Sequence, residues 1–161
     1  MVNYVKGDAT KPQGDGQKII AHIVNDEGLW GAGFVLAVDK LSPIPRNLYL
    51  QDYRYWTKNE GMVFIPLGQI QMSSVGHKNP DIMVCNMVAQ HRTIRTIEKP
   101  ICYKSLEAAL NLLAKEAIEM DASVHMPRIG AGLARGNWNV IESIIDRTLT
   151  LRDVDVTVYD L

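Results

Sequence analysis

The sequence is poor in the features that mark secreted, membrane-bound or nucleic-acid-binding proteins. Its two cysteines, Cys85 and Cys102, lie far apart without metal-site spacing, which predicts small core residues in a reduced, cytosolic setting. No apolar run is long enough to cross a membrane, and the N-terminus has no apolar signal-peptide core. A formal net charge of −1 gives no general attraction to nucleic acid or to anionic membranes. We therefore expect a cytoplasmic monomer.

What is present is an alternation of strand and helix patterns. The 161 residues, 47% of them hydrophobic, suffice for one domain with a full core, residues 1–161. Strands are predicted at residues 2–5, 19–24, 62–69, 82–89, 122–126 and 154–159, and helices at 34–41, 46–59, 102–120 and from 138 onward after an Asn137 cap. Pro66 suggests that the third strand lies at an edge. Residues 73–81 and a charged stretch at 90–100 are expected to be loops, the latter mobile. This order predicts an α/β fold, a three-layer α/β/α sandwich around a mixed central sheet.

Two glycine-rich loops each lie between a strand and a helix. The first covers residues 25–34, and the second runs from the strand end at His125 to the helix start at Trp138. Glycines let the backbone approach a ligand, and free N–H groups beside a helix N-terminus suit a phosphate. Because ligands of such folds sit at the carboxyl ends of the strands, both loops and a turn at Asp8 are expected to share one cleft. The alternative is that the glycines merely turn the chain.

Four motifs in order resemble those of the macrodomain family. They are Gly7-Asp8-Ala9-Thr10, Ile20-Ala21-His22-Ile23-Val24-Asn25, Gly31-Ala32-Gly33 and Pro127-Arg128-Ile129-Gly130-Ala131-Gly132. The resemblance spans nearly the whole chain. The last loop and the C-terminal strand look most like one branch, which contains the yeast-type ADP-ribose-1''-phosphate phosphatase and the terminal ADP-ribose protein glycohydrolase. The resemblance implies a protein that binds ADP-ribose and needs no cofactor.

The resemblance also implies roles for individual residues. Asp8 would accept a hydrogen bond from the adenine amino group, although a turn or cap role is the alternative, and Ala9 would belong to the ligand-binding residues beside it. Asn25 would face the distal ribose, since an amide can donate and accept at once, or it would simply be a strand-end turn residue. Tyr159 would line the adenine side or belong to the core. The two phosphate loops would comprise Gly31, Ala32 and Gly33, and Gly130, Ala131, Gly132 and Leu133.

The chain departs from the glycohydrolase pattern at two positions. Gln90 stands where that enzyme has its nucleophilic lysine, and Ala134 stands where it has the partner aspartate. An amide cannot form a Schiff base, and alanine has no acid or base function. The sequence therefore disfavours removal of ADP-ribose from glutamate by the lysine route.

The candidate catalytic residues that remain near the distal ribose are His22, Asn25 and Asp26. An ordinary imidazole exchanges protons near neutral pH, so His22 could assist attack of water on a 1''-phosphate; the alternative is a buried structural histidine. The four histidines are scattered without carboxylate partners, so no metal site is predicted. The favoured activity is hydrolysis of ADP-ribose 1''-phosphate. The alternatives are a non-catalytic reader of ADP-ribose or a related signalling nucleotide, and a de-ADP-ribosylating hydrolase with a substrate-assisted route.

Overall fold

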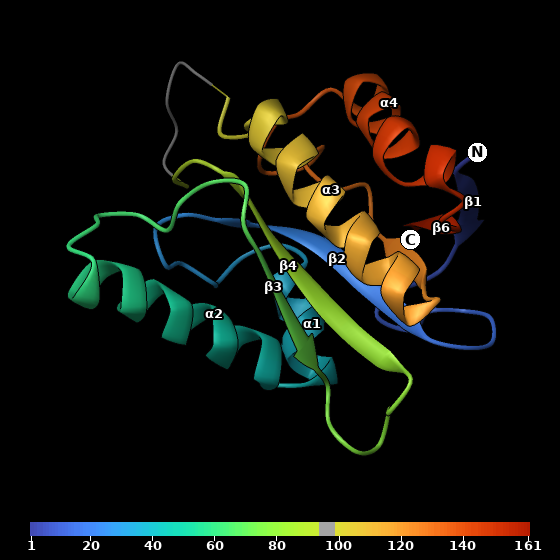
Figure 1. Cartoon of the computed structure of the whole chain (residues 1–161), viewed down its shortest axis with the longest axis horizontal. Helices are drawn as coiled ribbons and strands as arrows, with labels where there is room; N and C mark the ends of the chain where they lie inside the picture. Colours follow the sequence, from blue (N-terminus) through green and yellow to red (C-terminus); the bar gives the residue numbers. More distant parts are fainter. Residues whose placement is uncertain (94–98) are drawn as a thin grey trace.

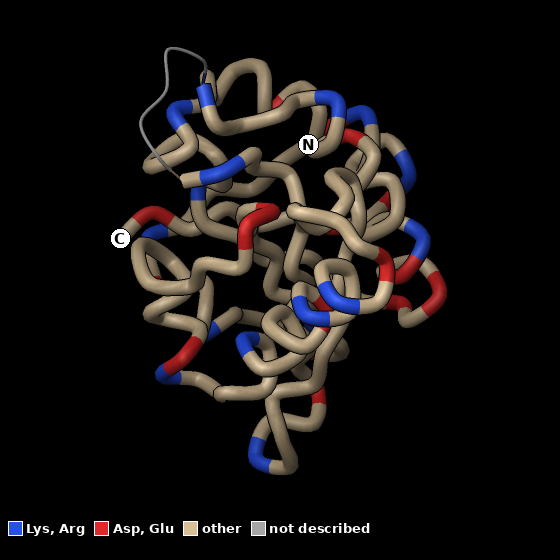
Figure 2. Tube along the Cα trace, turned by 90° about the vertical axis from the view of Figure 1, so that its left-hand side faces the viewer, with Lys and Arg blue, Asp and Glu red and all other residues tan. Residues whose placement is uncertain are grey.

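The computed structural model describes residues 1–93 and 99–161 (Figure 1). Residues 94–98, the middle of the loop expected at 90–100, lie outside the described residues, and so does the prediction of mobility made for them. Positions of Lys and Arg are interspersed with positions of Asp and Glu along the trace (Figure 2).

One mixed six-stranded sheet forms the centre of the molecule. Its strands are β1 (Asn3–Lys6), β2 (Lys18–Asn25), β3 (Ile70–Ser74), β4 (Ile82–Gln90), β5 (Ser123–Met126) and β6 (Val156–Asp160). They lie in the order β1-β6-β5-β2-β4-β3. All neighbouring pairs are parallel except β3 with β4. The five parallel strands therefore direct their carboxyl ends to one edge of the sheet.

Helices cover both faces of this sheet (Figure 1). One face carries α3 (Tyr103–Met120) and α4 (Trp138–Thr148), and the other carries α1 (Val35–Leu41) and α2 (Ile44–Arg54). The predicted three-layer α/β/α sandwich with a mixed sheet is thus confirmed. In the part of the chain that the structure describes, no helix combines the length and the apolar character that a membrane span requires.

The alternation of side chains along β2 explains why the strand reads as a continuous apolar run. Ile19 and Ala21 are buried against α3 and α4, whereas Ile20 and Val24 are buried in the clusters beneath α1 and α2. A parallel strand covered on both faces needs apolar residues at nearly every position. His22 is therefore a polar exception within a fully covered strand.

The strand predicted at residues 62–69 is wrong. That segment is irregular, and the edge strand β3 begins only at Ile70. Pro66 has no N–H for a ladder, and Gly68 adopts a left-handed backbone with φ of +93°. The true strand was hidden because its inward-facing residues, Gln71 and Ser73, are polar although they are buried. The loop expected from residue 73 accordingly starts after Ser74.

Other boundaries differ only slightly from the expectation. The helix predicted at 46–59 is α2, which starts at Ile44, followed by a π-helical turn, Tyr55–Asn59. The predicted cap of α4 is confirmed, since Asn137 Oδ1 accepts a hydrogen bond from the backbone N–H of Asn139 at 2.9 Å. The last strand is shifted toward the C-terminus and runs to Asp160.

Candidate functional site

Two adjoining cavities form a cleft at the carboxyl edge of the parallel strands. Their volumes are about 980 Å³ and about 260 Å³, and ligand pockets commonly measure about 300–1,000 Å³. Residues from both glycine loops line both cavities, so the structure brings the two loops together as the sequence predicted. The walls common to both cavities come from Ile23, Ala32, Val35, Gln90, Gly132 and Leu133.

The glycines of the two loops have different structural tasks. A Cβ on Gly130 would overlap the side chain of Ile101, and one on Gly136 would overlap the carbonyl oxygen of Gly130, so these two allow close packing. Gly33 has φ of +79°, and a Cβ there would lie 3.4 Å from Leu133 Cδ1, which shows how closely the loops approach. Gly132 faces open space and has no unusual φ. Gly132 is therefore a position where a side chain would enter the cleft without straining the fold.

Asp8 organises a tight turn after β1. Its Oδ1 accepts hydrogen bonds from Thr10 N at 2.8 Å and from Thr10 Oγ1 at 2.7 Å, and these bonds lower the pKa of the carboxyl group. Tyr159 is buried, and its hydroxyl accepts a hydrogen bond from Gln13 N at 2.9 Å and bonds to His125 Nδ1 at 2.7 Å. Tyr159 thus anchors the loop that follows the Asp8 turn. Among the described residues, the walls of the two cavities include neither Asp8, nor Ala9, nor Tyr159.

Asn25 lines the larger cavity, but its amide forms hydrogen bonds within its own loop. Its Oδ1 accepts from Glu27 N at 3.0 Å and from Leu29 N at 3.2 Å, and its Nδ2 donates to the carbonyl of Leu29. The hydroxyl of Tyr49, fully buried, contacts Asn25 Oδ1 at 2.8 Å and accepts from Gly28 N at 3.1 Å. This geometry favours the strand-end turn role for Asn25, which shapes the first glycine loop.

Asp26 is buried and is paired with residues of the segment after β4. Its carboxylate is 2% exposed and lies 2.7 Å from His91 Nδ1, while Oδ1 accepts from Arg92 N at 2.8 Å. These contacts join the end of β2 to the segment after β4. Of the three predicted catalytic residues, His22 and Asn25 line a cavity, and Asp26 does not belong to the described wall residues.

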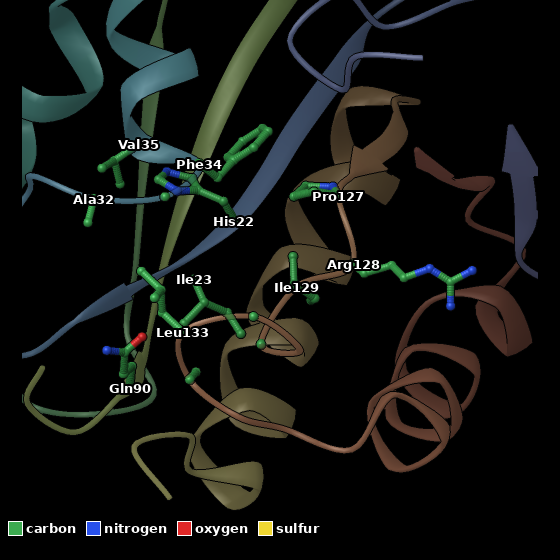
Figure 3. A pocket seen from close by; sticks show the side chains of 14 residues that line it. His22, Ile23, Ala32, Phe34, Val35, Gln90, Pro127, Arg128, Ile129 and Leu133 are labelled. Atoms are coloured by element: carbon green, nitrogen blue, oxygen red, sulfur yellow. The ribbon is translucent and has the colours of Figure 1, made fainter. Parts of the chain in front are cut away.

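His22 lies on the wall of the smaller cavity, on the same side as Ala32, Phe34 and Val35 (Figure 3). Its ring is buried, 5.4 Å from the ring of Trp30 and 5.7 Å from that of Phe34. Burial lowers the pKa of His22 to about 4, because the hydrogen bond to Asn86 only partly offsets the loss of hydration. A pKa lowered this far leaves the ring neutral at pH 7, which favours the alternative of a buried structural histidine over proton exchange near neutral pH.

The cleft contains few groups with acid or base chemistry. Among its described wall residues, the titratable side chains are His22, Arg128 and Arg135. Arg128 points away from the cavity (Figure 3): its guanidinium donates to both carboxylate oxygens of Asp160, at 2.7 and 3.1 Å. Gln90 and Ala134 both line the smaller cavity. Within residues 1–93 and 99–161, no group of three or more metal-ligating side chains is found.

Several residues that shape this site were not predicted from the sequence. Tyr49 holds the first loop, Trp30 covers His22, and Asn86 and Gln71 form a buried polar chain behind it. Asn86 did carry a signal, because it is a polar residue in the middle of an otherwise apolar strand. Tyr49 and Trp30 carried none, since aromatic residues in a helix or loop are common core residues.

Comparisons with solved structures identify proteins that resemble this chain along its whole length. No protein-family model matches the chain. The chain is similar to a solved protein of unknown function from Bacteroides thetaiotaomicron, with 41% identity, a TM-score of 0.91 and coverage of 100% of this chain and 98% of that one. It is also similar to a macrodomain protein from Streptomyces coelicolor, with 42% identity, a TM-score of 0.82 and coverage of 100% and 99%.

Curated relatives include proteins with named activities. The mouse chromodomain-helicase-DNA-binding protein 1-like is 33% identical over 98% of this chain, which spans only 17% of that protein. An ADP-ribose 1''-phosphate phosphatase from Meyerozyma guilliermondii is 27% identical over 96% of this chain and 98% of its own. The human ADP-ribose glycohydrolase OARD1 is 26% identical over 99% and 91%. With the Streptomyces coelicolor protein matched along its whole length and the same sheet and glycine loops in place, the chain belongs to the macrodomain family.

Proposed function

We propose that residues 1–161 form a single macrodomain whose cleft binds ADP-ribose. The observation that carries the proposal is the meeting of two glycine loops, from the ends of β2 and β5, across one cavity system of ligand size. The diphosphate would lie between the loops, where backbone N–H groups favour negative charge. The phosphate contacts are assigned to Gly31, Ala32, Gly33, Gly130, Ala131, Gly132 and Leu133.

The adenine end is assigned to the Asp8 turn. Asp8 Oδ1 already accepts two hydrogen bonds from Thr10, so Oδ2 is the atom proposed to accept from the adenine amino group, with Ala9 beside it. The lowered pKa keeps this carboxyl group an acceptor at neutral pH. Tyr159 would act on the adenine side through Gln13, by holding the loop after the turn in place.

The distal ribose is assigned to the larger cavity, beside Asn25. The amide of Asn25 already forms hydrogen bonds with Leu29, Glu27 and Tyr49. Its proposed contribution to binding is therefore to keep the first glycine loop in position beside the ribose. Asp26 would act in the same indirect way, by fixing the segment after β4 through His91 and Arg92. Both residues are thus proposed as positioning residues.

The proposed reaction is hydrolysis of ADP-ribose 1''-phosphate to ADP-ribose and phosphate. The oxygen of water would bond to phosphorus and release one proton to solvent, the bond from phosphorus to O1'' would break, and O1'' would take up a proton from solvent. Since His22 is neutral at pH 7, catalysis would rest on orientation and on loop N–H groups that stabilise the developing charge. Support comes from the similarity to a phosphatase of this substrate along nearly both whole chains.

A second candidate function is a non-catalytic reader of ADP-ribose. The side chains that line the cleft favour this function. His22 is neutral and Arg128 is paired with Asp160. Gln90 and Ala134 provide neither a nucleophile nor a base. Such a site can bind without turning over.

One assay with a parallel binding measurement separates the two candidates. Purified protein is incubated with ADP-ribose 1''-phosphate and released phosphate is followed, while calorimetry measures ADP-ribose binding. Saturable binding with multiple-turnover phosphate release supports the phosphatase. Binding without release leaves the reader, and release of ADP-ribose from ADP-ribosylated protein or nucleic acid would instead indicate de-ADP-ribosylation. Absence of ADP-ribose binding would refute the proposal as a whole.

A further inference from the structure

A chain of polar side chains, all buried except the half-buried Asp52, runs behind the cleft from α2 to β2. Gln71 Nε2 donates to Asp52 Oδ2 at 2.7 Å, and Asn86 Nδ2 donates to Gln71 Oε1 at 3.1 Å. Asn86 Oδ1 in turn lies 2.6 Å from His22 Nε2. Each member comes from a different element, so the chain exists only in the folded protein.

The carboxylate at one end sets the direction of every hydrogen bond. Ionised Asp52 can only accept, so Gln71 must turn its NH₂ group toward it and its oxygen toward Asn86. Asn86 must then present its NH₂ group to that oxygen and to the carbonyl of Pro45, at 3.1 Å. Its own oxygen faces His22, and therefore His22 Nε2 must carry the proton.

The other ring nitrogen of His22 is consequently a fixed lone pair. A neutral imidazole that is protonated at Nε2 has an unprotonated Nδ1, which can accept but not donate. His22 Nδ1 is buried, and no residue that the structure describes offers it a hydrogen bond. Buried polar atoms are rarely left unpaired, so the unpaired Nδ1 of a residue that lines a cavity indicates a missing partner.

We propose that His22 Nδ1 is a hydrogen-bond acceptor subsite of the smaller cavity, which takes an O–H donor. The donor is either a ribose hydroxyl of the bound nucleotide or a water held beside it. The proposal rests on the proposed binding of ADP-ribose in the cleft, and it specifies which kind of group binds beside His22. It also gives His22 a role other than acid or base catalysis: the residue orients a hydroxyl group.

The same lone pair excludes other groups from this position. An ionised phosphate oxygen has no proton to donate, so it would face the Nδ1 lone pair at close range with no compensating bond. The cavity wall at Ala32, Phe34 and Val35 is otherwise apolar (Figure 3). His22 therefore disfavours a phosphate beside it and keeps the diphosphate to the glycine loops.

The tautomer can be measured in the unmodified protein. Long-range ¹H–¹⁵N NMR spectra of histidine-labelled protein distinguish protonated from unprotonated ring nitrogens. The expected result is an unprotonated Nδ1 and a protonated Nε2 for His22 near neutral pH, and a changed Nδ1 resonance when ADP-ribose is added. A protonated Nδ1 in the free protein would overturn the inference, whether or not ADP-ribose binds.

Substitutions of His22 test whether its acceptor contributes to the affinity for ADP-ribose. His22→Phe removes the acceptor, and His22→Gln retains both a donor for Asn86 and an acceptor for the cavity. We expect His22→Phe to weaken ADP-ribose binding about 2- to 12-fold, the effect of one net hydrogen bond, and His22→Gln to restore part of it. Thermal unfolding and circular dichroism monitor the folding of both variants. If His22→Phe does not fold, the ADP-ribose affinity of His22→Gln is compared with that of the wild-type protein.

Analogues of ADP-ribose that each lack one ribose hydroxyl separate the two sources. If a ribose hydroxyl is the donor, His22→Phe and wild-type protein will bind the corresponding analogue equally well. If a water is the donor, the variant will lose the same factor for every analogue. Wild-type affinity of a folded His22→Phe variant for ADP-ribose would overturn the inference, whereas loss of binding by the wild-type protein itself would refute the proposed function.

Discussion

Mild acidification should destabilise this protein through two buried histidines. His22 and His125 are 1% and 2% exposed, and burial lowers the pKa of each from 6.5 to about 4. For His125, the nearby positive charge of Lys18 adds to the effect of burial. Both rings are therefore neutral in the folded state at a pH where the unfolded chain would protonate them.

The magnitude follows from the two pKa values. Above the unfolded value of 6.5, neither state binds a proton at these rings, and their contribution to stability is complete. As the pH falls toward about 4, the unfolded chain gains protons that the folded protein does not bind, so stability is lost. Between about pH 7 and about pH 5 each histidine should lower the free energy of unfolding by about 2 kcal/mol, and both by about 4 kcal/mol.

Urea unfolding at intervals between these two pH values measures the effect. The wild-type protein should lose about 4 kcal/mol, and His22→Gln, which has no titratable ring at this site, should lose about half as much over the same interval. A free energy of unfolding that stays constant from pH 7 to pH 5 would show that the folded and unfolded states take up the same number of protons, so that burial does not lower the pKa of either histidine. It would also restore His22 as a candidate acid or base.

Three further predictions concern the cleft. Gly132→Glu should fold normally and bind ADP-ribose about 10³-fold more weakly. The reason is that two like charges 4 Å apart near a surface repel by about 4 kcal/mol. Calorimetry should show much tighter binding by the uncharged control Gly132→Gln. Asp8→Asn should keep the turn but present an NH₂ group to the base, so its preference should shift from ADP-ribose toward GDP-ribose; equal ratios in variant and wild type would contradict the role given to Asp8. Tyr49→Phe should destabilise the fold by about 1–3 kcal/mol in urea unfolding, because the carbonyl of Asn25 and the N–H of Gly28 lose a buried partner; unchanged stability would show that the loop does not need it.

The layers of the fold were predictable because they follow from local pattern. The apolar run of β2 and the stripe along α3, with Leu106, Leu110 and Leu113 fully buried, are readable without any tertiary information. The edge strand β3 was missed because Gln71 and Ser73 are polar residues that are nevertheless buried, and the partners of Gln71 lie elsewhere in the chain. Gln71 is a strand residue because Asn86 and Asp52 satisfy its amide.

The site was predictable to the extent that topology determines it. Parallel strands place the loops after β2 and β5 at one edge, so the meeting of Gly33 and Gly132 in one cleft could be foreseen. The protonation state of His22 could not be predicted, because its pKa depends on burial of the ring, which lies beside Trp30 and Phe34. The separation of Asp26 from the cleft was equally hidden, since its partner His91 lies 65 residues away.

Calorimetric titration of the wild-type protein with ADP-ribose, and then with GDP-ribose, tests the central claim most directly. The glycine loops and the Asp8 turn predict saturable binding of one ADP-ribose per chain and clearly weaker binding of GDP-ribose, whose base presents an oxygen acceptor to Asp8. Absence of saturable heat with ADP-ribose would contradict the assignment of the cleft as an ADP-ribose site. Equal affinity for the two ligands would contradict the place given to the adenine.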